Sequence, residues 1–338
     1  MKNIQSTLDR KRTITDNKFF QLLGVSPFGV AVFVVLALSP LFIEDQYVMH
    51  LLISSLMFGA LAIGFDFTVG FINIVNFGYA AFMGVGAYTS ALLVSRLDFS
   101  PWLSMLIGSL LAAILGFLIG LLTLRLRGMF AAIMAWFFGI TLMSIAANMV
   151  DLTRGHLGLN VPILFPGAGR DAYFYLILGI TAVTYIVLRK IINSHIGLAF
   201  QAIGQNIEAA RSSGVDSTKY RVFNFTVSCF FAGLIGGFYA FFVGVLTPAV
   251  MHTRVTVEIL VLCYIGGRGS LWGGLLAAFL IIPVFEYLRP LMEIRLIIYG
   301  LLMILVMIYY PGGMAAVYDQ LVDLVKDMLG KKNKSTAS

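Results

Sequence analysis

Few residues of this chain belong to the types that do chemistry. Its 338 residues include 16 Asp and Glu, four His and two Cys. The histidines are too scattered to indicate a metal site. No P-loop signature is present, so the sequence predicts no nucleotide bound by this chain itself. No Ser/His/Asp set and no H-E-x-x-H run indicates hydrolysis. The sequence therefore points away from an enzyme and predicts no cofactor bound by this chain.

One short polar pattern stands in the charged connection 189–221. It predicts a helix that starts at Gln205 or Asn206, with Glu208 in its first turn at the positive end of the helix dipole. Gly214 is the residue type that ends helices in the left-handed conformation. The small residues Ala209 and Ala210 would form a smooth face that fits into a groove of another protein. A solvated helix without a partner fits the same pattern, so both interpretations stay open.

The elements that position these residues are membrane helices. Hydrophobic residues make up 59% of the chain and charged residues 12%, against roughly 45–50% and about 25% in soluble proteins. We expect an all-α, polytopic integral membrane protein of about ten transmembrane helices with Gly-rich broken segments. The expected spans are 28–43, 47–65, 77–95, 101–122, 129–150, 172–188, 222–247, 257–267, 271–288 and 294–310. Segment 257–267 is too short to cross alone unless the Gly-rich turn after it lies within the membrane.

The net charge of +7 is a topology signal and does not indicate a nucleic-acid partner. Lys and Arg cluster before the first span, in the 189–221 connection and in the tail, which is the pattern of cytoplasmic segments. Ten crossings place both termini in the cytoplasm. The expected organisation is a cytoplasmic segment at 1–27, a transmembrane domain at 28–310 and a cytoplasmic tail at 311–338. The tail carries apolar residues at helical spacing, which suggests a short amphipathic helix on membrane lipid.

Two Gly-rich breaks, 66–78 and 264–274, are the candidate transport path, because unwound backbone within a membrane is tolerated only beside a cavity or buried protein. Asp66 is the carboxylate most suited to a functional role, since a charge at this depth needs a partner or water. Asn73 and Asn76 would either bind a zwitterion or tie helices together. The remaining candidates are Gly70, Gly78, Gly266, Gly267 and Gly269.

The 205–214 pattern resembles a known motif. Glu208-Ala209-Ala210, three further residues and Gly214 match the E-A-A-x-x-x-G core of ABC importer permeases. In that family the motif forms the coupling helix that docks on a separate ATPase subunit. The fuller family motif continues with a Leu-Pro pair, which this chain lacks. That departure fits the branched-chain amino acid permeases, whose loop diverges from the general pattern.

Further runs are similar to the LivM-like branch of these branched-chain amino acid permeases. They occur in order along the chain, at 69–88, 125–128, 152–158, 231–237, 266–270 and 309–313. Two departures concern the substrate side: Tyr79 replaces the usual His, and Arg154 interrupts a double glycine. The ordered set is specific although each motif alone is weak.

The resemblance implies a permease subunit in a bacterial inner membrane, importing branched-chain amino acids. It also implies partners: ABC ATPase subunits that hold ATP and Mg, a second related permease subunit, and a periplasmic substrate-binding protein. The residues alone leave another class open, an ion-coupled carrier or channel with Asp66 as the ion-linked group. Neither the resemblance nor the residues alone decide whether the substrate is leucine, isoleucine, valine, urea or a short amide.

Overall fold

The computed structural model describes residues 27–43, 45–123, 129–165, 167, 169–288, 294–309 and 312–316, and they are mainly helical. Among the described residues, seven helices are long and apolar enough to cross a membrane, which is consistent with the expected all-α, polytopic membrane protein but not with all ten expected spans being long helices. Six of them are α4 (Gln46–Val69), α5 (Tyr79–Leu97), α6 (Pro101–Thr123), α7 (Met129–Asn148), α9 (Arg170–Ile192) and α12 (Ser217–Val243). The seventh includes α15 (Ile294–Tyr309).

Shorter elements complete the bundle. The apolar ones are α3 (Pro27–Leu38), α13 (Thr253–Gly266) and α14 (Gly273–Tyr287). The connecting helices are η1 (Ser39–Leu41), α8 (Val150–Thr153), η2 (Gly155–Leu157), α10 (His195–Gln205), α11 (Ile207–Ser212) and η3 (Pro248–Met251). One antiparallel pair joins β1 (Leu159–Asn160) to β2 (Val245–Leu246).

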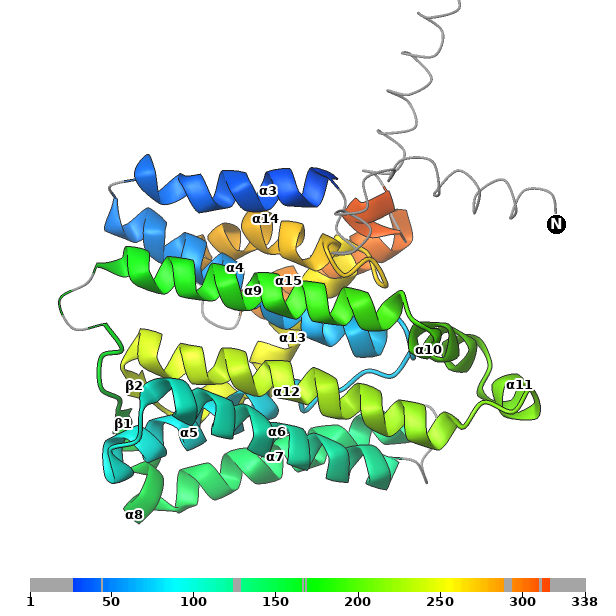
Figure 1. Ribbon diagram of the computed structural model, residues 1–338, viewed down its shortest axis with the longest axis horizontal. Coiled ribbons are helices and arrows are strands. Elements are labelled where there is room, and N and C mark those ends of the chain that lie inside the picture. The colour runs from blue at the N-terminus through cyan, green and yellow to red at the C-terminus, as the bar shows by residue number, and fades with distance from the viewer. Residues whose placement is uncertain are drawn as a thin grey trace, which may run out of the picture.

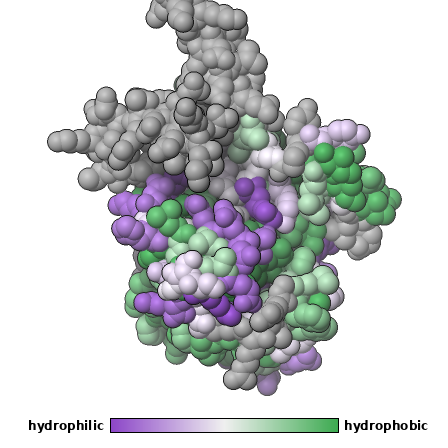
Figure 2. All heavy atoms as spheres, turned by 90° about the vertical axis from the view of Figure 1, so that its right-hand side faces the viewer, coloured by the Kyte–Doolittle hydropathy of each residue, from purple (hydrophilic) through white to green (hydrophobic). Residues whose placement is uncertain are grey.

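The long helices lie side by side, and their connections gather at two opposite ends (Figure 1). We call one the α11 end, where α10 and α11 lie, and the other the hairpin end, where α8, β1 and β2 lie. Seen from the α11 end, hydrophilic residues gather on the surface while hydrophobic residues cover the flanks (Figure 2). This distribution suits a body whose flanks contact lipid and whose ends contact water.

Glycines let α5, α6 and α12 approach closely, as the four-residue spacing of small residues predicts. A Cβ on Gly236 of α12 would lie 1.9 Å from the Met83 carbonyl oxygen of α5. A Cβ on Gly233 would lie 2.5 Å from the Ala112 Cβ of α6. Within lipid there is no hydrophobic driving force for helix association. Van der Waals contact between these closely spaced backbones is therefore a main source of packing energy here.

Several helix boundaries differ from the expected ones. α4 continues through Asp66 to Val69, so the first break begins at Gly70. α9 and α12 reach into the 189–221 connection and leave only residues 193–216 between them. The short span expected at 257–267 begins at Thr253, and η3 precedes it. In each case the expected boundary was set by the run of apolar residues, and it left out helical turns that carry polar residues.

Some expectations fall outside the described residues. These are the cytoplasmic segment at 1–27, apart from Pro27, the turn at 125–128 and the tail after 316, including its amphipathic helix. Arg154, which replaces a glycine of the family motif, adopts a left-handed conformation with φ of 59°. That backbone explains why glycine suits the position.

The close helix packing predicts a stability effect. Gly236→Ala should lower the free energy of unfolding by about 1–3 kcal/mol, because α5 and α12 must separate to admit the methyl group. Gly179→Ala on α9 is the matched control, since nothing lies within 4 Å of its Cβ position. Denaturation midpoints in detergent measure both variants. Equal midpoints for the two would contradict the packing account.

Candidate functional site

The two Gly-rich breaks meet at the α11 end of the bundle. One is the segment 70–78 between α4 and α5, and the other is the loop 267–272 between α13 and α14. A Cβ on Gly70 would lie 2.5 Å from the backbone nitrogen of Gly269, so the two backbones are in direct contact. Segments about 200 residues apart in the chain therefore form one structure, which we call the break junction.

Asp66 holds the break junction together. Its Oδ1 accepts a hydrogen bond from the Gly269 N–H at 2.8 Å and one from the Cys263 thiol at 3.3 Å. Its Oδ2 accepts one from the Leu271 N–H at 2.9 Å. The side chain is 2% exposed. Charged acceptors make strong hydrogen bonds, and these satisfy backbone donors that the broken helix leaves unpaired. Both carboxylate oxygens are engaged by the protein, which favours a structural role over ion binding.

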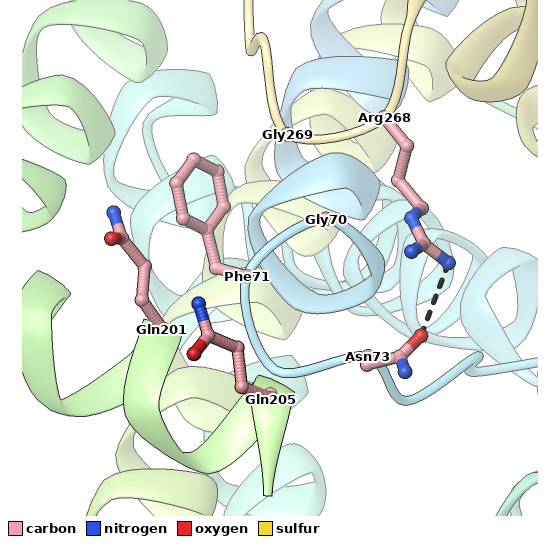
Figure 3. Close-up of a pocket in the computed structure, with 8 residues that line it drawn as sticks. Gly70, Phe71, Asn73, Gln201, Gln205, Arg268 and Gly269 are labelled. Atoms are coloured by element: carbon pink, nitrogen blue, oxygen red, sulfur yellow. Dashed lines mark hydrogen bonds between the residues drawn. The ribbon is translucent and has the colours of Figure 1, made fainter. Parts of the chain in front are cut away.

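A pocket of about 340 Å³ opens beside the break junction. Its wall combines the first break, the second break and α10: Gly70, Phe71, Asn73, Gln201, Gly204, Gln205, Arg268 and Gly269. The Arg268 guanidinium donates a hydrogen bond to the Asn73 side-chain oxygen at 3.1 Å, across the two breaks (Figure 3). Gln201 and Gln205 project from one face of α10 (Figure 3). The wall is mixed, with polar side chains from Asn73, Gln201, Gln205 and Arg268 beside the apolar Phe71 ring and three glycines.

The other expected path residues lie away from this pocket. Asn76 is buried, and its side-chain oxygen accepts from the Gly78 N–H at 3.1 Å, which forms a local turn before α5. Gly78 packs against the Ala135 carbonyl of α7. Gly266 and Gly267 pack against the backbones of Gly273 and Gly312. The pocket thus brings together Gly70, Asn73 and Gly269, and leaves the other five candidates, including Asp66, in structural contacts.

The helix expected at 205–214 is present as α11. The Asn206 side chain caps it by accepting from the N–H groups of Glu208 and Ala209, at 3.0 and 3.1 Å. Glu208 lies in the first turn, and Gly214 has φ of 83° just after the helix end. Ala210 corrects the expected binding face, because it is 4% exposed and packs inward. The exposed face carries Glu208 and Ala209.

Gly204 links α11 to the break junction. A Cβ at Gly204 would lie 2.3 Å from the Phe71 carbonyl oxygen, so the end of α10 rests on the backbone of the first break. α11 follows α10 after the single residue Asn206. α11 is therefore linked to the break junction through α10, and it also contacts α12 through the Arg211–Ser217 hydrogen bond at 2.7 Å. Sequence reasoning missed the Gly204–Phe71 contact.

Metal chemistry has no support in the described part of the chain. Among those residues, no three His, Cys, Asp or Glu side chains come together in a way that could hold a metal ion. The arrangement instead offers a pocket of mixed polarity, a loop held by the Asp66 carboxylate and a projecting helix.

Asp66→Asn should lower the free energy of unfolding by about 1–3 kcal/mol. The isosteric amide places an NH₂ donor where an oxygen now accepts, and a buried backbone donor loses its partner. The denaturation midpoint in detergent measures the effect. Asp171→Asn, at an exposed first turn of α9, is the control and should leave the midpoint unchanged. A wild-type midpoint for Asp66→Asn would show that the carboxylate does not hold the loop.

Comparisons with known proteins identify relatives of this chain. Two curated permeases named LivM, described as high-affinity branched-chain amino acid transport system proteins, are each 28% identical to the chain. The one from Escherichia coli aligns over 83% of this chain and 72% of its own length. The one from Salmonella typhimurium aligns over 75% of this chain and 66% of its own length. A probable LivH permease of Methanocaldococcus jannaschii is 26% identical over 76% of this chain and 88% of its own.

A further relative is named for a different kind of solute. A permease of Lactococcus lactis named as a nucleoside ABC transporter component is 26% identical over 50% of this chain and 59% of its own length. No solved structure matches the chain. The family described as "Branched-chain amino acid transport system / permease component" matches residues 47–307, which include all the long helices and both breaks. The chain belongs to this family of membrane permeases of ABC importers.

Proposed function

We propose that this permease imports branched-chain amino acids through a bacterial inner membrane, driven by separate ABC ATPase subunits. The α11 helix carries the proposal, because it is capped, projects at the polar end of the bundle and contacts the break junction through α10. A second related permease subunit and a periplasmic binding protein complete the transporter. ATP and Mg bind to the partner ATPases, and this chain contributes no catalytic step.

The distribution of basic residues supports the proposal that the α11 end faces the cytoplasm. Six basic residues lie at or near it: Arg189, Lys190, Arg211, Lys219, Arg221 and Arg268. Among the residues whose side chains the structure describes, three lie at the hairpin end: Arg96, Arg154 and Arg170. An excess of Lys and Arg marks the cytoplasmic side. Ten crossings with both termini in the cytoplasm fit this orientation, with η3 and α13 together making the eighth crossing.

The transport cycle follows from the contacts. Closure of the ATPases would push α11, and α10 would press on the first break at Phe71. The break junction would move as a unit because Asp66, Gly269 and Leu271 are joined. Movement of these breaks would open the path toward one side and close it toward the other. Such rigid-body gating needs little chemistry from the permease itself.

The test of this function is uptake by vesicles that contain this chain and its partner subunits. Leucine uptake should require ATP hydrolysis and the binding protein, and should persist when ion gradients are collapsed. Uptake that follows an ion gradient would establish the carrier alternative. Uptake of a nucleoside in place of leucine would overturn the proposed substrate while leaving the ATP-driven mechanism intact.

Glu208→Lys should abolish co-purification of the ATPase subunits while membrane insertion continues. The change places a cation at the positive end of the α11 dipole and reverses the charge of the exposed face. Asp171→Lys makes the same change in the first turn of α9 at the hairpin end and should leave co-purification intact. Undiminished capture of the ATPase by Glu208→Lys would refute α11 as the docking helix.

Gly204→Val should raise the amount of ATP hydrolysed per leucine imported. The added side chain pushes α10 away from the Phe71 backbone, so motion of α11 no longer reaches the breaks efficiently. Paired measurements of hydrolysis and uptake give the ratio, and Gly179→Val on the open face of α9 is the control. A wild-type ratio in Gly204→Val would rule out this contact as the transmission point.

A further inference from the structure

The pocket beside the break junction holds hydrogen-bonding groups that the proposed mechanism does not use. The side chains of Asn73, Gln201, Gln205 and Arg268 line it and are all exposed. A guanidinium has five N–H donors, and within the described part of the chain Arg268 uses one of them, on Asn73. Gln201 and Gln205 make no hydrogen bond to any residue that the structure describes. The pocket therefore has spare donors and acceptors that are open to water.

The charge of the wall selects the kind of ligand. Arg268 is the one charged side chain among the described residues that line the pocket. Asp66 lies outside the wall, and both of its carboxylate oxygens accept hydrogen bonds from other groups. A single guanidinium matches one carboxylate, because two of its N–H groups can donate in parallel to the two oxygens. The wall thus favours a small acid with one negative charge.

Size and shape narrow the ligand further. The volume of about 340 Å³ lies at the small end of the range of about 300–1,000 Å³ that is usual for small-molecule sites. Arg268 and Asn73 lie to one side of Gly70, whereas the Phe71 ring and Gln201 lie to the other (Figure 3). A carboxylate and a short apolar chain would each meet a suitable part of the wall. Leucine has both groups, and urea and nucleosides have no carboxylate.

We propose that this pocket binds the carboxylate of leucine or a similar small acid from the cytoplasm, and that the bound acid slows import. The inference rests on the proposed function, which places the α11 end in the cytoplasm. The wall takes residues from α10 and from both breaks, so motion between these elements changes its shape. A ligand that binds only the open pocket favours the arrangement in which it is open. Accumulated solute therefore slows its own import.

Protection from a thiol reagent tests the binding. In the assembled transporter in detergent, Gln201→Cys should react with a charged thiol reagent, and excess leucine should slow the reaction severalfold. Isocaproate, which keeps the carboxylate but lacks the ammonium group, should also slow it, whereas leucinamide, which lacks the carboxylate, should not. His195→Cys, exposed at the start of α10 and outside the wall, is the matched control and should react equally with and without leucine. The native Cys229 and Cys263 are buried, so their background is low.

Three results would overturn the site: no protection by leucine, no protection by isocaproate, or equal protection by leucinamide. Arg268→Gln, added to Gln201→Cys, should remove the protection while the reaction without ligand continues. Arg268→Lys should retain part of it, because the charge remains without the paired donors. Full protection in Arg268→Gln would show that leucine binds elsewhere and would contradict the proposal.

Vesicles that contain the transporter and internal ATP test the regulation. Leucine loaded inside should lower the initial rate of uptake of external labelled leucine severalfold relative to the same vesicles without it. Gln201→Glu should show a smaller relative decrease, because its charge repels the carboxylate, and His195→Glu, outside the wall, should match the wild type. Equal relative decreases in Gln201→Glu and wild type would overturn the regulation. Wild-type uptake without a need for ATP would instead overturn the proposed function, and the protection result would stand apart from it.

Discussion

The structure depends on one buried carboxylate that satisfies the backbone of a broken helix pair. A membrane offers no water to hydrogen-bond unwound backbone, so a break needs a polar partner within the protein. Asp66 provides it by accepting from Gly269 and Leu271, which lie in the loop that follows α13. Together with the Gly70–Gly269 backbone contact and the Arg268–Asn73 hydrogen bond, this side chain joins the end of α4 to the distant loop.

This junction is the part of the permease that the proposed ATPase partner would move. The break junction sits at the polar end of the bundle, against α10, and α11 follows α10 after one residue. The Gly204 contact with the Phe71 carbonyl leaves no space between them for a side chain. In the proposed mechanism, a force on α11 would pass to the segment 70–73 by this backbone contact. The energy would come from the proposed ATPase partner.

Much of the fold could be predicted from the sequence because apolar segment length is a strong signal. The α11 helix was also predictable, since Asn206, Glu208 and Gly214 are local signals whose effect does not depend on distant residues. The inward position of Ala210 was not, because burial depends on the packing of α12 beside it. Nor was the meeting of Gly70 with Gly269, which is fixed by the register of α4 against α14. Helix caps can be predicted directly from the sequence, whereas contacts between residues far apart in the chain cannot.

The central claim is that α11 is the surface on which an ATPase acts. A photoreactive amino acid at exposed Ala209 tests it in the assembled transporter, with the same probe at Leu157, which is 86% exposed near the hairpin end, as the reference. The account predicts a covalent product that contains the ATPase subunit from position 209 and none from position 157. The absence of that product at 209, or equal products from both positions, would contradict it.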